Sequence, residues 1–150
     1  MILTLAILSI LVWAGVKDFR FGIISNSLSL SVFVLGLANA ALSGWLLAST
    51  ASAAIVLIIM IIPYAKGWMG GGDTKLLAAV ATLAPPEHLL LLSLAVSIAA
   101  GVQASLILLV WYGLGRRWEV GHTQEKPEMP LAPAIAISVA AYVVMRPTMI

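Results

Sequence analysis

The sequence contains no cysteine and very little charge. Without cysteine, disulfide bonds, thiolate metal sites and a thiol nucleophile are all excluded. Only 9% of the 150 residues are charged, whereas a soluble domain carries roughly a quarter, so the polar surface is too small to cover a globule in water. The formal net charge of +2 gives no support for nucleic-acid binding. His88 and His122 have no partner at ligand spacing, so neither a metal nor another cofactor is expected.

The chain is instead rich in apolar sequence, with hydrophobic residues making up 62% of it. Polar residues, glycines and prolines divide it into six apolar segments, at 2–16, 27–47, 51–64, 74–84, 88–114 and 131–145. In lipid every backbone amide must be paired within its own segment, so these runs are expected to be helices. We therefore predict an all-α, polytopic membrane protein. A single integral-membrane domain over 1–150 would hold about six transmembrane or partly embedded helices.

The segment lengths predict different relations to the bilayer. About 20 helical residues cross a membrane, and only 27–47 and 88–114 reach that length. The segment 74–84 is the shortest because Pro85 and Pro86 follow it, so it is not expected to span the membrane alone. The first segment has neither a basic region before it nor a cleavage site after it, and we predict a retained helix rather than a signal peptide.

The basic residues predict the orientation. If six helices alternate, three connections fall on one side, and they hold seven of the eight lysines and arginines, namely Lys17, Arg20, Lys66, Lys75, Arg116, Arg117 and Lys126. Only Arg146 lies on the opposite side. The positive-inside rule makes the basic side cytoplasmic and places both termini outside.

Two of the six acidic residues stand apart from the rest. Asp18 follows the first apolar segment and Asp73 precedes the fourth, so both are expected on the same side at similar depth. Two such carboxylates can hydrolyse a peptide, because the ionised one takes a proton from water while its protonated partner polarises the scissile carbonyl. Close together they cannot both ionise easily, and their protons are expected to leave in coupled steps.

Each aspartate also has a purely structural interpretation. Asp18 is equally explained as an interfacial charge paired with Lys17 or Arg20. Asp73 is equally explained as the N-cap of the fourth helix, accepting a hydrogen bond from its first turn.

Three glycines, Gly70, Gly71 and Gly72, precede Asp73. Without Cβ atoms they are expected to let the backbone turn tightly and to let a peptide approach it closely, although a linker or a close-packing surface would also explain them. They also leave free amides at the start of a helix, where the dipole favours an anion. Together with Lys75, these amides lead us to expect that Asp73 is the more readily ionised aspartate and that Asp18 more often holds the proton.

The stretch GGGDTKLLAA resembles the second catalytic motif of the type IV prepilin peptidases, Gly-x-Gly-Asp followed by a lysine and a small, apolar helix. Gly70, Gly72 and Asp73 occupy its fixed positions. The stretch KDFRFGIISN resembles the first motif, Asp-x-Arg followed by Ile-Pro-Asn. Its matching residues are Asp18, Arg20, Ile24 and Asn26, and Ser25 stands where the family usually has proline. The stretch MPLAPAIAIS is similar to the sequence that opens the last helix of short members.

The resemblance implies an intramembrane aspartyl endopeptidase with Asp18 and Asp73 as the catalytic pair and Gly70–Gly72 as backbone support. It would remove the short basic leader of type IV pilin-like precursors at the cytoplasmic face of the bacterial inner membrane. Larger family members carry an extra cytoplasmic segment and also methylate the new N-terminus. This chain has no room for that segment and resembles the short, peptidase-only branch associated with Flp pili, so methyltransferase activity is not expected.

The implied partners are prepilin-like precursors and membrane lipid, with no nucleic acid, and a homo-oligomer is left open. Arg20, Asn26 and Lys75 are candidate substrate-binding or orienting residues. The two bases are expected to meet an acidic residue early in the mature pilin, a glutamate in the family's substrates, although topology also explains them.

Two other classes of function fit the same residues. One is a related intramembrane aspartyl protease with another client, of the preflagellin or signal-peptide type. The other is a non-enzymatic membrane subunit, or a proton-coupled transporter that uses the aspartates as a relay.

Overall fold

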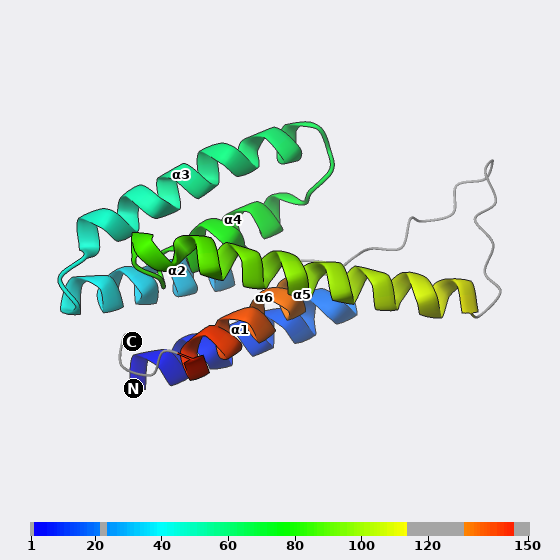
Figure 1. The fold of residues 1–150 in the computed structure, drawn as a ribbon, viewed down its shortest axis with the longest axis horizontal. Coiled ribbons are helices and arrows are strands. Elements are labelled where there is room, and N and C mark those ends of the chain that lie inside the picture. Colours follow the sequence, from blue (N-terminus) through cyan, green and yellow to red (C-terminus); the bar gives the residue numbers. More distant parts are fainter. Residues whose placement is uncertain (1, 22–23, 114–130, 146–150) are drawn as a thin grey trace.

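The computed structural model describes residues 2–21, 24–113 and 131–145 (Figure 1). Of these residues 87% are helical and none lies in a strand, which confirms the predicted all-α fold. The helices are α1 (Ile2–Phe21), α2 (Asn26–Leu42), α3 (Leu46–Ala65), α4 (Gly71–Ala81), α5 (Pro86–Gly113) and α6 (Ala132–Met145). Among the residues considered above, His122, Arg116, Arg117, Lys126 and Arg146 lie outside the described part.

The short helix α4 lies at the centre of the arrangement. It packs against α2, α3 and α6, while α1 pairs with α6 and α5 packs mainly on α6 (Figure 1). Every residue from Ala78 to Ala84 is buried, and Leu76 is fully buried. The core that joins these helices draws on Leu11 of α1, Val32 of α2 and Ile135 of α6. The helix α4, which carries Asp73 in its first turn, is therefore held on several sides by other helices.

The second apolar segment is divided where the sequence predicts a continuous run. Gly44 adopts a left-handed φ of 81°, its N–H donates to the carbonyl of Ala41, and the Trp45 N–H donates to that of Ala40. This pair of bonds ends α2 as a Schellman motif. The new helix α3 starts at Leu46, so α2 has 17 residues and α3 has 20.

This division changes which helices can cross a bilayer. In the described part of the chain, α3 and Glu87–Val110 of α5 are long and apolar enough to span it. Only 17% of an apolar 18-residue stretch of α3, and only 6% of one in α5, is buried. A core helix of a soluble protein would be mostly buried, so both helices point to a membrane protein. The prediction for the fifth segment is confirmed. The second segment is shorter than expected, because its helix has 17 residues and ends before Leu47. The third segment gains the flanking residues that the sequence indicated it would need, and reaches 20 residues. The fourth forms an 11-residue helix.

Candidate active site

Asp18 lies in the last turn of α1 and is buried, with only 6% of its surface exposed. Its Oδ2 accepts a hydrogen bond of 2.9 Å from the backbone N–H of Ala132, the first residue of α6. The first amides of a helix have no partner inside it, and the helix dipole favours an anion there. The contact therefore gives one oxygen of the Asp18 carboxyl a hydrogen-bond donor from another helix.

A close approach of α1 and α6 makes this hydrogen bond attainable. One turn before Asp18, a Cβ atom on Gly15 would lie 3.2 Å from Cα of Pro133. A larger residue at this position would push the start of α6 away from α1. Gly15 thus belongs to the geometry that places the Ala132 amide on Asp18, and the sequence offered no signal for it beyond a single glycine in an apolar run.

Asp73 is half-buried in the first turn of α4. The N-cap of this helix is Gly70, with φ −70° and ψ 148°, so the interpretation of Asp73 as the N-cap is wrong. Asp73 instead occupies the third position and forms a hydrogen bond with the Gly70 backbone, the reciprocal contact of a capping box. Its Oδ1 is buried and has no hydrogen-bond partner among the described residues.

The two aspartates interact electrostatically although they come from helices far apart in the sequence. Burial raises the pKa of Asp73 to about 6, the negative charge of Asp18 raises it as well, and the Gly70 hydrogen bond acts in the opposite direction. Asp73 lies on α4, which is too short to cross the membrane. The structure therefore brings together the two carboxyls that the sequence predicts as a pair.

The helix amides do act to lower the pKa of Asp73, as expected, but burial and the charge of Asp18 outweigh them, so the net shift is upward. Which of the two aspartates is the more readily ionised stays a prediction. Lys75 does not compensate, because its Nζ donates to Oδ1 of Asn26 at 2.9 Å. The Lys75 ammonium, on which the expectation for Asp73 partly depended, is thus engaged in a hydrogen bond between α4 and α2.

The three glycines do not form the predicted tight turn. The turn before them is made by Gly67, at φ 69°. A Cβ atom on Gly72 would lie 2.9 Å from Cβ of Ile24, and one on Gly71 would lie 3.2 Å from the Tyr64 ring. The space beside Gly71 and Gly72 is therefore filled by the chain's own side chains and is not open to a peptide. These glycines let α4 begin in close contact with its neighbours, which fixes the position of Asp73.

Ser25 preserves the backbone that a proline would adopt. As the N-cap of α2 it has φ −66° and ψ 133°, and proline fixes φ near −65°. The departure from the family's usual residue therefore leaves the chain direction between Ile24 and Asn26 unchanged.

The candidate substrate-binding residues fall into two separate places. Asn26 and Lys75, which bond to each other, line a groove of about 330 Å³ together with Ser29. The Ser29 hydroxyl is buried and has no hydrogen-bond partner in the described part of the chain, and the sequence gave no reason to select it. Arg20 is exposed and lines a different groove, beside Pro133 on α6. Within the described ranges, no group of three or more His, Cys, Asp or Glu residues could hold a metal ion.

Comparison with known proteins gives one match. The sequence model of the type IV leader peptidase family matches residues 5–105, a stretch that contains both aspartates and the three glycines. No curated protein and no solved structure matches the chain. Since the matched stretch covers more than half of the sequence, the chain belongs to the type IV leader peptidase family and is a membrane-associated peptidase.

Proposed function

We propose that the protein is an intramembrane aspartyl endopeptidase that removes the short basic leader of type IV pilin-like precursors of the Flp kind. The electrostatic interaction between Asp18 and Asp73, which come from different helices, is the main support for the proposal. The buried Oδ1 of Asp73, which has no hydrogen-bond partner among the described residues, adds to it. Family membership supports a leader peptidase in general. The two aspartates support the aspartyl mechanism, and the resemblance to the short branch of the family supports a peptidase-only activity.

The contacts suggest a division of roles between the two carboxyls. Asp73, whose pKa is raised to about 6, holds the shared proton and donates a hydrogen bond to the scissile carbonyl oxygen. Asp18, which accepts the Ala132 amide, is ionised and takes a proton from the attacking water. As the water oxygen bonds to the carbonyl carbon, the carbonyl oxygen takes the Asp73 proton. The C–N bond then breaks and the leaving nitrogen takes the proton from Asp18. One hydroxyl group of the tetrahedral intermediate returns its proton to Asp73. This assignment reverses the one expected from the sequence.

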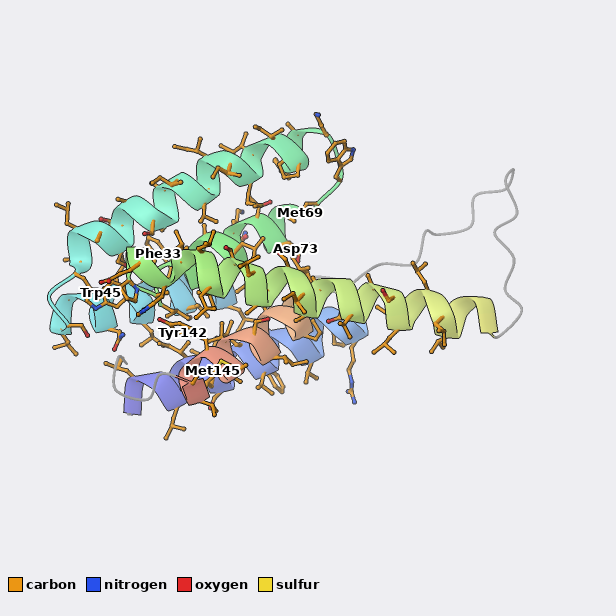
Figure 2. The ribbon with its side chains drawn as sticks, in the orientation of Figure 1. Phe33, Trp45, Met69, Asp73, Tyr142 and Met145 are labelled. Atoms are coloured by element: carbon orange, nitrogen blue, oxygen red, sulfur yellow. The ribbon has the colours of Figure 1, made fainter. Side chains whose placement is uncertain are left out.

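The basic residues support a cytoplasmic location for this site in a multi-pass inner-membrane protein. Lys17 and Arg20 lie at the end of α1, and Lys66 follows the end of α3. Figure 2 shows Asp73 and Met69 toward that end of the bundle and Trp45 toward the other. By the positive-inside rule the aspartates then face the cytoplasm, where the basic leader is cut.

The bond between Asn26 and Lys75 supports an orienting role for both residues. It holds an exposed ammonium group at a groove between α2 and α4, close in sequence to Asp73. We propose that this ammonium meets an acidic side chain near the cleaved bond of the precursor. Arg20, on the α1–α6 surface, would serve the same purpose from the other side of Asp18.

Co-expression with an Flp-type prepilin tests the proposed function. Wild type is compared with Asp18→Asn, Asp73→Asn and the control Glu87→Gln, an exposed acid in the first turn of α5. Leader removal is scored on a gel at equal amounts of enzyme in the membrane. Each aspartate variant is expected to lose activity by about 10³-fold or more, while the control cleaves normally. Normal leader removal by either aspartate variant would overturn the proposal and favour a non-enzymatic subunit or transporter. Cleavage only of a preflagellin-type precursor would show a different client.

A further inference from the structure

A second, larger groove of about 540 Å³ opens between α3, α4 and α5. It exists because α3 packs on α4 while α5 packs mainly on α6, so the face of α5 toward α3 is barely covered. Figure 1 shows α3 and α5 diverging from the end where both begin. Both helices are long and apolar enough to cross a bilayer, so we expect the groove between them to face the hydrocarbon region.

Residues that lie close to the candidate catalytic pair in the chain line one end of this groove. Leu77 lines it and follows Asp73 by one helical turn, so the two side chains share a face of α4. Leu131 also lines it and directly precedes Ala132, whose amide binds Asp18. Met69, at the same end of the bundle as Asp73 in Figure 2, is a further lining residue. Residues near Asp73 and near the amide donor of Asp18 therefore line this end of the groove.

The lining of the groove suits a helix. On α5 it runs from Leu89 to Ala100, which is roughly 17 Å at 1.5 Å per residue, or about three turns. Ser93, Ser97 and Ala100 recur there at helical spacing and are small, which lets another helix approach closely. The hydroxyls of Ser93 and Ser97 bond to backbone carbonyls of α5 itself, so they present no unsatisfied polar group to an apolar partner.

We propose that this groove holds the apolar transmembrane helix of the uncleaved precursor, with the leader end of that helix beside Asp18 and Asp73. The inference rests on the proposed function, because the precursors that the family resemblance implies carry a basic leader followed by an apolar helix that stays in the membrane. A helix seated along α5 would deliver the bond between leader and helix to the aspartates at the end of the groove. A lipid chain bound in the same groove would make no specific contact that holds one of its ends beside the aspartates.

Cysteine cross-linking tests the inference, because the chain has no cysteine of its own. Ser97→Cys and Ala100→Cys place a thiol in the groove, and Ile98→Cys places one on an adjacent residue that is 66% exposed and outside the groove lining. Each change is combined with Asp73→Asn to prevent cleavage. An Flp-type prepilin with one cysteine in its apolar helix is co-expressed and oxidised in membranes. Disulfide-linked product is expected to be several-fold higher for Ser97→Cys and Ala100→Cys than for Ile98→Cys.

The same cysteine variants with Asp73 intact separate the two proposals. Absence of leader removal by wild type would overturn the proposed function. Normal leader removal combined with equal cross-linking at all three positions, or with none, would overturn the groove assignment and leave lipid as its occupant. As a second measurement, Ala100→Trp should raise the KM for the precursor several-fold with little change in kcat. Ile98→Trp should change neither, and equal effects of the two tryptophans would contradict the assignment.

Discussion

The backbone N–H of Ala132 donates a hydrogen bond to Oδ2 of Asp18 and so joins the end of α1 to the start of α6. The partner aspartate has the opposite environment, because Oδ1 of Asp73 is buried and lacks a hydrogen-bond partner within the described residues. The two carboxyls thus have different hydrogen-bonding environments. Under the proposed roles Asp18 is the ionised partner and Asp73 holds the shared proton, and this asymmetry can be measured without any substrate.

Asp18→Asn is expected to lower the pKa of Asp73 from its value of about 6, because the substitution removes the negative charge that helps to raise it. The pKa should remain above its ordinary value, since burial is the larger cause. Infrared or carbon NMR titration of the Asp73 carboxyl gives the measurement. Glu87→Gln, at the start of α5, serves as the control and should leave the Asp73 titration unchanged. An Asp73 titration that is identical in Asp18→Asn and wild type would show that the carboxyls do not interact.

The pH dependence of cleavage should follow the protonation of Asp73. An acid whose pKa is about 6 carries its proton below that pH and loses it above. Under the proposed roles, kcat/KM for an Flp-type prepilin falls as the pH rises through this value, since kcat/KM reports the free enzyme. The profile is measured in detergent with purified enzyme. A rate that instead rises through the same interval would assign the proton to Asp18.

Asp73→Asn is expected to stabilise the fold at neutral pH while it removes activity. With a raised pKa, the folded state binds more protons than the unfolded state between the ordinary aspartate pKa and about 6. Stability therefore falls as the pH rises across that interval. The amide carries no charge and escapes this loss. Thermal unfolding should show a higher Tm for Asp73→Asn than for wild type above pH 6, and the gap should close toward about pH 4. A gap that widens on acidification would contradict the prediction.

Gly72→Ala should damage the enzyme, whereas Gly101→Ala should not. An added Cβ at residue 72 would come within 2.9 Å of Cβ of Ile24, while one at residue 101 meets nothing within 4 Å. Overpacking of this kind costs about 1–3 kcal/mol, and here it would also move Asp73 relative to Asp18. Gly101 lies inside α5, where alanine is the better helix former by about 0.5–1 kcal/mol. Thermal unfolding and leader removal are measured for both variants, and equal behaviour of the pair would exclude a packing role for Gly72.

The sequence was sufficient for the all-α class and for the family, because apolar length and motif spacing are local properties. The selection of Asp18 and Asp73 as the catalytic pair stays a prediction. The sequence could not reveal the division at Gly44, where one left-handed residue ends a helix inside an apolar run. Nor could it show why Gly72 is a glycine. The reason is Ile24, which lies far away in the sequence and against α4 in the fold. The direction of the Asp73 pKa shift likewise depends on burial and on a neighbour from another helix.

The stretch that matches the family stops at residue 105, yet α6 begins at Ala132. A truncated chain that ended after α5 would keep both carboxyls and all three glycines of the motif. It would nevertheless leave a buried acid on α1 deprived of its amide donor from the last helix. The smallest active fragment of this enzyme should therefore include the C-terminal helix, even though that helix carries neither of the proposed catalytic side chains.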